Sequence, residues 1–318
     1  MSDEKTGGTD RAKPGTRAGF VAIVGAPNAG KSTLVNTMVG SKVSIVSPKV
    51  QTTRMRVIGI AMADLPDGTR SQVVLVDTPG IFRVAKRRLE RAMVAAAWQG
   101  AKDADVVALM VDAENGMGAE TRAIAERLKE TALPRYLILN KIDLVPRPKL
   151  LDLTAEMNAI VPFESTFMVS ALQKDGVADV LAQFAAAVPP GPFLYPEDQA
   201  ADLPLRLLAS EVTREQVFLQ LHQELPYEAA VETEQWTERP DGSVRIEQII
   251  HVQRDGQRAI VLGKGGARIK SIGERARREL SQMLERKVHL FLHVKVSERW
   301  AEDRAHYRTI GLDYDGKT

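Results

Sequence analysis

Short apolar runs alternate with helix-like stretches from Gly19 to about Ala187. Between the runs, apolar positions recur every three to four residues, as in LERAMVAAAWQGA (89–101) and ETRAIAERLKET (120–131). This alternation predicts an α/β domain with a mostly parallel sheet and helices on both faces. The predicted strand runs are FVAIVG (20–25), VVLVDTPG (73–80), ADVVALMVDA (104–113), RYLILNKID (135–143) and TFMVS (166–170).

A proline-rich stretch ends this pattern and marks a domain boundary. Residues 188–204 contain five prolines and one glycine, so they continue neither a helix nor a central strand. Beyond them the pattern predicts the order α-β-β-α-α-β, with strands over 228–235, 244–253 and 287–296. The predicted divisions are a disordered polar tail (1–18), a first domain (19–188), a linker (189–204), a second, α+β domain (205–300) and a C-terminal tail (301–318).

The composition is that of an ordinary globular protein of about two domains, with 318 residues, 44% hydrophobic and a net charge of +2. The absence of cysteine excludes a disulfide framework, a thiol nucleophile and Cys-ligated metal centres. No apolar run reaches the ~18 residues of a membrane-spanning helix, and the N-terminus lacks the apolar core of a signal peptide. We therefore expect a cytoplasmic protein. The first 221 residues contain no histidine, so the first domain has no histidine base.

A phosphate-binding motif, G-x-x-x-x-G-K-[ST], follows the first strand run and precedes a helical pattern. Its glycines let backbone N–H groups surround phosphate oxygens, and the helix N-terminus adds its positive end. We expect Lys31 to reach the β- and γ-phosphates and the Ser32 hydroxyl to bind Mg²⁺. Chance gives this pattern in about one chain in a hundred, which disfavours a simple glycine turn. The motif comprises Gly25, Ala26, Pro27, Asn28, Ala29, Gly30, Lys31 and Ser32, with Thr33 next to it.

A second motif, Asp77-Thr78-Pro79-Gly80, ends another strand run. An aspartate at this place can hold Mg²⁺ through a water molecule, and a glycine N–H can meet the γ-phosphate. Composition alone supplies D-x-x-G about once per chain. The evidence for a functional motif is therefore its place after the phosphate-binding motif in the chain and directly after a predicted strand.

A third motif, Asn140-Lys141-Ile142-Asp143, predicts which base is bound. A carboxylate at Asp143 accepts hydrogen bonds from N1–H and the 2-amino group of guanine, and adenine offers neither donor. Asn140 is expected to contact the base edge, and the Lys141 stem to cover the ring. Ser170 and Ala171 follow the next strand, where backbone N–H groups can meet guanine O6.

The ordered set GAPNAGKS, QTTR, DTPG, NKID and SA resembles the translation-factor-related small GTPases. The second half, with VLGKGGARIKSIG, resembles the Era subfamily, and the resemblance covers about residues 19–300. It implies a P-loop GTPase domain followed by a type II KH domain, with GTP and GDP as ligands. It also implies assembly of the small ribosomal subunit by binding near the 3′ end of its ribosomal RNA. Some relatives are membrane-peripheral, and we expect a monomer.

The segment Gln51-Thr52-Thr53-Arg54 lies where GTPases carry their first switch. A threonine there can bind Mg²⁺ only while the γ-phosphate is present, so the loop orders with GTP and is released after hydrolysis. We favour Thr53 for this role, with Thr52 as the alternative.

Two substitutions shape the expected hydrolysis. Ile81 follows the second motif, where Ras-type enzymes place a glutamine that orients water, and isoleucine has no group for that task. In related GTPases an asparagine at the position of Asn28 binds K⁺, whose charge can replace an arginine finger. We therefore expect slow, Mg²⁺-dependent hydrolysis stimulated by K⁺, with Lys31, Thr53, Asp77, Gly80 and Asn28 as the catalytic set. Arg54 as a finger within the chain is the alternative.

The loop Gly263-Lys264-Gly265-Gly266 is a G-x-x-G pattern between two predicted helices. A KH domain clamps a single-stranded nucleic-acid backbone with such a loop. From 264 to 287 there are eight basic residues against three acidic ones, a local excess that the whole-chain charge conceals. The expected RNA-binding residues are Gly263, Lys264, Gly265, Gly266, Arg268 and Lys270.

Three rival functions are weighed against this reading. The related double-GTPase family is disfavoured because the chain has one phosphate loop and an intact G-x-x-G. A membrane-peripheral signalling GTPase predicts lipid binding and no effect of Gly265→Asp. A non-hydrolysing RNA-binding protein with GTP as a structural ligand is disfavoured by Lys31, Ser32 and Asp77.

Overall fold

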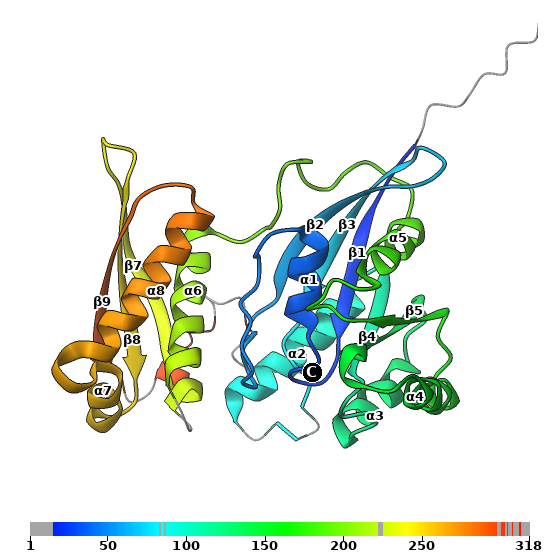
Figure 1. Ribbon diagram of the computed structural model, residues 1–318, viewed down its shortest axis with the longest axis horizontal. Coiled ribbons are helices and arrows are strands. Elements are labelled where there is room, and N and C mark those ends of the chain that lie inside the picture. The colour runs from blue at the N-terminus through cyan, green and yellow to red at the C-terminus, as the bar shows by residue number, and fades with distance from the viewer. Residues whose placement is uncertain are drawn as a thin grey trace, which may run out of the picture.

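The computed structural model describes residues 15–82, 84–85, 87–221, 225–297, 300–302, 304, 307 and 312. Two domains lie side by side and are joined by a long connection (Figure 1). Most of the polar tail predicted at the N-terminus lies outside the described residues. The first strand begins at Thr16, so the predicted tail ends earlier than residue 18. Within the described ranges, no helix has both the length and the apolar character needed to cross a membrane.

The first domain is built on a six-stranded sheet in the order β2-β3-β1-β4-β5-β6. All neighbouring strands are parallel except β2 and β3, which are antiparallel. This confirms the predicted mostly parallel sheet and adds the edge strand β2, which the sequence analysis did not pick out. The strands are β1 (Thr16–Val24), β2 (Val57–Asp64), β3 (Arg70–Asp77), β4 (Val106–Asp112), β5 (Arg135–Asn140) and β6 (Ser165–Val169).

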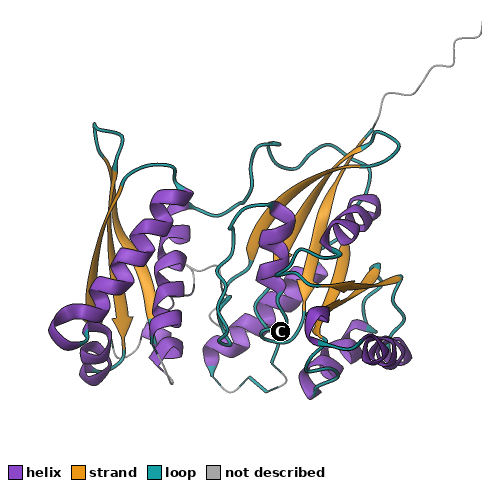
Figure 2. Ribbon diagram, in the orientation of Figure 1, coloured by secondary structure: helices purple, strands orange, loops and turns teal. Residues whose placement is uncertain are grey.

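Helices cover both faces of this sheet, as Figures 1 and 2 show. In β1, Val21 and Ile23 pack into the cluster under α1 and α5, whereas Ala22 and Val24 pack into the cluster under α2, α3 and α4. Successive side chains of a strand point to opposite faces of the sheet. Because helices cover both faces, both sets of side chains are buried and apolar. The helices are α1 (Lys31–Val39), α2 (Arg88–Lys102), α3 (Ala119–Leu128), α4 (Arg147–Ile160) and α5 (Val177–Ala187), with the short 3-10 turn η1 (Ile142–Leu144).

The second domain has the predicted order α-β-β-α-α-β, extended by short 3-10 turns. Its three-stranded sheet, β7-β8-β9, pairs β7 and β8 antiparallel and β8 and β9 parallel. Alternate residues of β8 are buried against the helices, which lie on one face of the sheet (Figure 2). The elements are α6 (Leu205–Gln220), η2 (Leu225–Glu228), β7 (Ala230–Glu238), β8 (Val244–Val252), α7 (Asp255–Leu262), η3 (Lys264–Gly266), α8 (Ala267–Met283), β9 (Val288–Val296) and η4 (Trp300–Glu302).

The predicted linker forms no helix and no strand, but it is held against the first domain. The Gln72 side chain accepts hydrogen bonds from the backbone N–H groups of Leu194 and Tyr195 and donates one to the Tyr195 carbonyl. Further on, the linker exchanges backbone hydrogen bonds with Ile58 and Ile60 of β2. The proline content therefore ends regular structure without releasing the chain from the domain.

The C-terminal segment packs between the two domains. The described side chains of Trp300, Tyr307 and Leu312 are buried in a cluster with Leu89 and Met93 of α2. The Trp300 indole N–H also donates to the carbonyl of Glu228 at 2.9 Å. This segment therefore contributes to the contact between the domains rather than forming a free tail.

Candidate nucleotide and RNA sites

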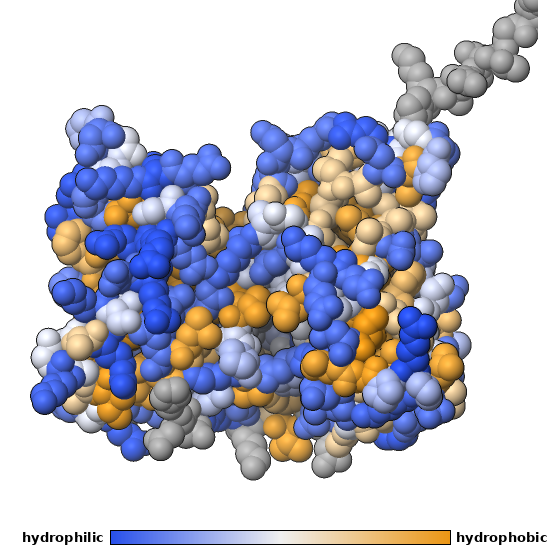
Figure 3. All heavy atoms as spheres, viewed as in Figure 1, coloured by the Kyte–Doolittle hydropathy of each residue, from blue (hydrophilic) through white to orange (hydrophobic). Residues whose placement is uncertain are grey.

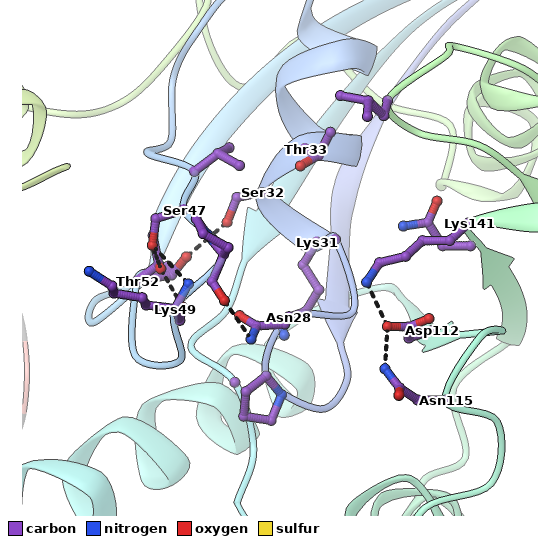
Figure 4. A pocket seen from close by; sticks show the side chains of 18 of the residues that line it. Asn28, Lys31, Ser32, Thr33, Ser47, Lys49, Thr52, Asp112, Asn115 and Lys141 are labelled. Carbon is purple, nitrogen blue, oxygen red and sulfur yellow. Dashed lines mark hydrogen bonds and ion pairs between the residues drawn. The ribbon is translucent and has the colours of Figure 1, made fainter. Parts of the chain in front are cut away.

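A cavity of about 520 Å³ lies at the edge where the parallel strands of the first domain end. Figure 4 shows it from close by, with the phosphate loop and α1 on one side and the ends of β4 and β5 on the other. Parallel strands end in loops at this edge, so motifs far apart in sequence meet there. The cavity lining brings together the following predicted residues: Pro27, Asn28, Gly30, Lys31, Ser32, Thr33, Thr53, Gly80, Asn140, Lys141, Asp143 and Ser170.

The remaining predicted residues lie behind this lining and hold it in place. The carbonyls of Gly25 and Ala26 accept hydrogen bonds from the Lys31 ammonium at 3.0 and 2.9 Å. The Thr78 hydroxyl donates to the carbonyl of Ile23 in β1 at 2.7 Å. The full set outside the lining is Gly25, Ala26, Ala29, Asp77, Thr78, Pro79 and Ala171.

The end of the phosphate loop requires glycine at position 30. Gly30 has a φ of 99°, and a Cβ there would lie 2.2 Å from the side-chain nitrogen of Asn140. Gly30 precedes the first turn of α1, so its conformation aims the N–H groups of that turn into the cavity. Lys31 follows at once, and burial lowers the pKa of its ammonium to about 8, partly offset by the charge of Asp77. The loop thus presents a desolvated cation beside backbone donors, which suits a phosphate group.

Three side chains from different segments meet beside the phosphate loop. The Ser32 hydroxyl donates to Asp77 Oδ2 at 2.6 Å and lies 2.8 Å from the Thr53 hydroxyl. The Ser44 hydroxyl donates to the same Asp77 oxygen at 2.7 Å, a contact that the sequence analysis did not predict. Asp77 Oδ1 is buried without a hydrogen-bond partner, and burial raises the pKa of this carboxyl above its ordinary value. An unpaired buried oxygen beside two hydroxyls is an oxygen-only donor set of the kind that a hard divalent cation prefers.

The two threonines of the first switch have different surroundings. Thr53 contacts Ser32, whereas the Thr52 hydroxyl bonds to the Ser47 hydroxyl and donates to the Lys49 carbonyl. The geometry therefore favours Thr53 over Thr52 as the cation ligand. Arg54 points away from the cavity, into the second domain, which argues against the alternative of Arg54 as an arginine finger.

The two positions singled out for hydrolysis also lie differently. Ile81 is buried among apolar side chains of the first domain, so its side chain does not face the cavity. Asn28 has a φ of 62° and donates from its amide nitrogen to the Pro48 carbonyl at 3.1 Å (Figure 4). Its amide therefore bridges the phosphate loop and the first switch segment.

Asn140 lines the cavity and also holds two loops together, a role that the sequence analysis did not predict. Its side-chain nitrogen donates to the Ala29 carbonyl at 2.8 Å, and its oxygen accepts the Ala171 backbone N–H at 3.0 Å. The amide is buried, and one of its two N–H groups and its oxygen have backbone partners, while Asn140 also lines the cavity. Asn140 thereby fixes the phosphate loop relative to the Ser170–Ala171 loop.

Replacement of Asn140 by alanine is expected to lower the free energy of unfolding by about 3 kcal/mol, because two buried backbone groups lose their partner. Asn158→Ala is the matched control. Asn158 also bonds one carbonyl and one N–H, those of Thr154 and Phe163, but it is exposed, so its loss should cost below about 1 kcal/mol. Urea unfolding of both variants checks this, and equal losses would contradict the role assigned to Asn140.

The base side of the cavity contains residues that the sequence analysis missed. The Lys141 ammonium lies 2.6 Å from Asp112 Oδ2, and Asn115 donates to the same oxygen at 2.7 Å (Figure 4). Leu144 and Leu172 also line the cavity and are 56% and 82% exposed, which is unusual for leucine. Apolar side chains at the rim, together with the Lys141 stem, suit the faces of a planar base. The position of Asp112, at the end of a strand run, was the only available signal for it.

The glycine-rich loop of the second domain links α7 and α8, as predicted. Gly263, Gly265 and Gly266 all have positive φ values, 70°, 59° and 76°. Lys264 lies within the loop, and Arg268 follows in the first turn of α8. Lys264 and Gly265 are exposed, and the glycines have no side chains, so the backbone of this loop can lie close to a ligand.

A groove of about 620 Å³ runs beside this loop, between α8 and β9. Lys270, predicted from its place near the loop, lines the groove together with Arg277, which was counted among the basic residues but not selected. Leu290 and Leu292 of β9 give the groove an apolar floor, and the acidic Glu274 of α8 also lines it. Hydrophilic residues cover α8 in the space-filling view (Figure 3). Two basic side chains beside an aliphatic floor suit a single-stranded nucleic acid, whose phosphates and bases differ in polarity.

Comparison with known proteins agrees with this division of the chain. A family model described as a 50S ribosome-binding GTPase matches residues 20–141, and one described as a KH domain matches residues 224–301. GTPase Era of Bradyrhizobium sp. strain BTAi1 is 58% identical over 299 residues, covering 94% of this chain and 95% of the relative. GTPase Era of Mesorhizobium japonicum is 56% identical over 314 residues, covering 99% of this chain and 98% of the relative.

Two solved structures are similar over both domains. One is Era in complex with MgGDPNP and nucleotides 1506–1542 of 16S ribosomal RNA, with a TM-score of 0.87 and 37% identity. The other is a variant of Era from Aquifex aeolicus bound to GDP and AlF4⁻, with the same TM-score and identity. Each match covers 93% of this chain and 99% of the solved chain. The similarity therefore includes the relative placement of the domains.

Proposed function

Because this chain belongs to the Era family of GTPases, we propose that it is a GTP-hydrolysing switch whose KH domain binds the 3′ region of small-subunit ribosomal RNA during assembly of that subunit. The observation that carries this proposal is the presence, in one chain, of a complete phosphate and base cavity and of a separate groove beside a G-x-x-G loop. The Era complex with a 16S ribosomal RNA fragment supports the choice of RNA. The first domain supplies the switch, and the second selects the place where it acts.

The residues beside the phosphate loop fit a magnesium ion. Ser32 and Thr53 would bind it directly and Asp77 through water, which would satisfy the buried Oδ1 atom that has no protein partner. Bound there, Mg²⁺ supplies positive charge against the β- and γ-phosphates. The Era complex with MgGDPNP supports this assignment. Lys31 would bring its ammonium to the same phosphates, and the Gly80 N–H would meet the γ-phosphate.

The base is held by the far side of the cavity. Asp143 accepts from N1–H and the 2-amino group of guanine, and the Lys141 stem lies along the ring. Asp112 and Asn115 fix the end of that stem, while Leu144 and Leu172 cover apolar ring surface. The backbone N–H groups of Ser170 and Ala171, which were expected to meet guanine O6, donate in this structure to the Asp175 carbonyl and to Asn140 Oδ1. Contact with guanine O6 would require the Ala171 N–H to exchange the Asn140 oxygen for O6. This arrangement discriminates by polar contacts, which reject a base that lacks the matching donors.

Hydrolysis is expected to be slow and to rise in K⁺ relative to Na⁺. The Asn28 amide nitrogen is engaged by Pro48, which leaves its carbonyl oxygen as the atom for a monovalent cation. We expect Asn28→Asp to weaken and Asn28→Ala to remove the K⁺ stimulation. Asn158→Ala is the control, because Asn158 is exposed on α4 and does not line the cavity. Phosphate release measured in matched KCl and NaCl gives the K⁺ stimulation of each variant. Unchanged K⁺ stimulation in Asn28→Ala would contradict the assignment of Asn28 as a K⁺ ligand.

Three further features of the proposal stay predictions. We expect a monomer in the cytoplasm, and for a membrane contact we expect a peripheral one. Light scattering of the purified chain tests whether it is a monomer. Sedimentation with anionic vesicles tests the peripheral membrane contact. Binding to vesicles in place of RNA would favour the rival signalling GTPase.

The function as a whole is tested by GTP turnover with and without a short RNA copying the 3′ end of small-subunit ribosomal RNA, at one stated salt concentration. We expect the RNA to bind and to change turnover. Turnover indifferent to the RNA, with no RNA binding in either nucleotide state, would leave the GTPase and remove the ribosomal assignment.

A further inference from the structure

Residues 42–54 contain the first switch motif (51–54) and are together called the switch segment. The KH domain binds this segment along its length. Helix α6 of that domain is buried on all sides from Ala209 to Phe218, although six of these ten residues are polar or charged. One side of α6 packs on its own sheet, so the other must be covered by the GTPase domain. The residues of the segment that hydrogen-bond to the KH domain are Lys42, Val46, Lys49, Thr52 and Arg54.

Two groups of these contacts lie immediately before and after Thr53. On the preceding side, the Arg214 guanidinium of α6 donates to the Thr52 carbonyl at 2.5 Å. On the following side, Arg54 donates to the carbonyls of Pro226, Tyr227 and Ala229 at 2.8 to 3.1 Å. Both peptide neighbours of Thr53 are therefore held by the other domain, while its hydroxyl contacts Ser32.

Arg214 is rigidly placed for this contact. Its Nε donates to Glu211 one turn earlier on α6 at 2.7 Å, and its Nη2 pairs with the other oxygen of the same carboxylate. Arg214 is 3% exposed and Glu211 is 9% exposed, so water does not compete for these bonds. The guanidinium also lies over the Phe218 ring, with 5.2 Å between its central carbon and the ring centroid. Nη1 is buried without a hydrogen-bond partner, but the bonds of Nε and Nη2 to Glu211 fix the plane of the guanidinium so that Nη2 faces Thr52.

Arg54 of the GTPase domain makes the second contact beside Thr53, with the KH domain. Its guanidinium lies 5.5 Å from the Phe218 ring centroid and 5.7 Å from that of Trp300. Burial, together with the nearby charge of Arg214, lowers the pKa of Arg54 to about 9, so it remains a cation at neutral pH. A buried cation held only by carbonyls and aromatic rings loses these interactions if the domains separate.

We propose that Arg214 is a positioning residue for the GTPase site: by holding the Thr52 carbonyl, the KH domain fixes Thr53 in the place where it binds Mg²⁺. This proposal rests on the role of Thr53 given under the proposed function. It makes the KH domain a part of the GTPase site as well as the RNA-binding module.

The same contacts connect the site to the RNA-binding helix. Lys42 pairs with Glu215 of α6 and with Glu279 of α8, the helix that begins at the glycine-rich loop. Glu215 in turn accepts the backbone N–H of Val46 at 2.8 Å. A displacement of α8 by RNA therefore acts on α6 and on the switch segment. By linkage, a change in the Mg²⁺ and γ-phosphate contacts of Thr53 alters RNA affinity to the same extent.

The test uses the full chain with Arg214→Lys, whose single nitrogen cannot reproduce the contacts that Nε and Nη2 together make with Glu211 and the Thr52 carbonyl. We expect the Mg²⁺ concentration for half-maximal GTP turnover to rise about tenfold, as for loss of one charge-assisted hydrogen bond. GDP affinity should stay unchanged, because Thr53 contacts the ion only with the γ-phosphate present. Arg206→Lys is the matched control, since Arg206 lies on the same helix and bonds only to carbonyls of its own domain. A Mg²⁺ requirement for Arg214→Lys within twofold of wild type would overturn the proposal.

Two additional variants keep the test decisive. Glu211→Gln combined with Arg214→Gln removes both buried charges together, so a shift in its Mg²⁺ requirement cannot come from an unpaired carboxylate. Thr53→Ala separates the two levels of the argument. If Thr53→Ala raises the Mg²⁺ requirement and the Arg214 variants do not, the positioning role alone is overturned. If none of them changes it, the assignment of Thr53 itself is wrong and the positioning role falls with it.

Discussion

Asp143→Asn is expected to lower the affinity for GTP by about 10⁴-fold, because it removes the acceptor of two guanine hydrogen bonds and sets an amide N–H against the 2-amino group. Asp143 lies in the η1 turn directly after β5, at the rim of the cavity. The variant should gain affinity for xanthosine triphosphate, whose base carries an oxygen in place of the 2-amino group. An asparagine accepts from N1–H of xanthine and donates to that oxygen. Competition of unlabelled nucleotides against a fluorescent analogue measures both affinities.

The exchange of preference separates a change in recognition from a loss of folding. Asp152→Asn is the matched control, because Asp152 lies exposed on α4 and does not line the cavity. It should bind GTP as the wild type does. Retention of GTP affinity in Asp143→Asn, or loss of affinity for both nucleotides, would contradict the role of Asp143 in reading the base.

Gly265→Asp is expected to weaken binding of the 3′ RNA at least tenfold while GTP turnover without RNA stays unchanged. Gly265 has a φ of 59° and no atom within 4 Å of the place where a Cβ would lie. Aspartate adopts this left-handed conformation more readily than most residues, so the variant should fold. Its carboxylate would then face the RNA phosphates from within the loop that clamps them. Filter binding or anisotropy at one stated salt concentration measures the effect.

Gly265→Asn is the matched control, since asparagine has the same shape without the charge. It should retain most of the affinity. If Gly265→Asp binds RNA as the wild type does, the loop does not contact the RNA backbone and the role assigned to it is wrong.

Local patterns predict much of this molecule because its motifs follow strands. The phosphate loop, Asp77-Thr78-Pro79-Gly80 and Asn140-Lys141-Ile142-Asp143 each end a strand of one parallel sheet, so their convergence follows from strand direction alone. The edge strand β2 escaped prediction because it joins β3 by a short hairpin at 65–69, without the intervening helix that marks the other strands.

Contacts between distant segments could not be predicted in the same way. Asn140 has the expected position, but its partners, Ala29 and Ala171, depend on how closely two loops approach. Arg54 was weighed as a catalytic group, and its actual partners lie more than 170 residues further along the chain. Sequence periodicity records which face of an element is buried, and it does not record which other domain buries it.

The central claim is that a GTPase site and an RNA-binding groove form one switch. It is tested most directly by the affinity of the full chain for the 3′ RNA in a non-hydrolysable GTP analogue with Mg²⁺ and in GDP, at the same salt concentration. The contacts between residues 42–54 and the KH domain predict that RNA affinity differs between the two states and is higher with the triphosphate. Equal affinity in both states would contradict the claim and leave two independent activities in one chain.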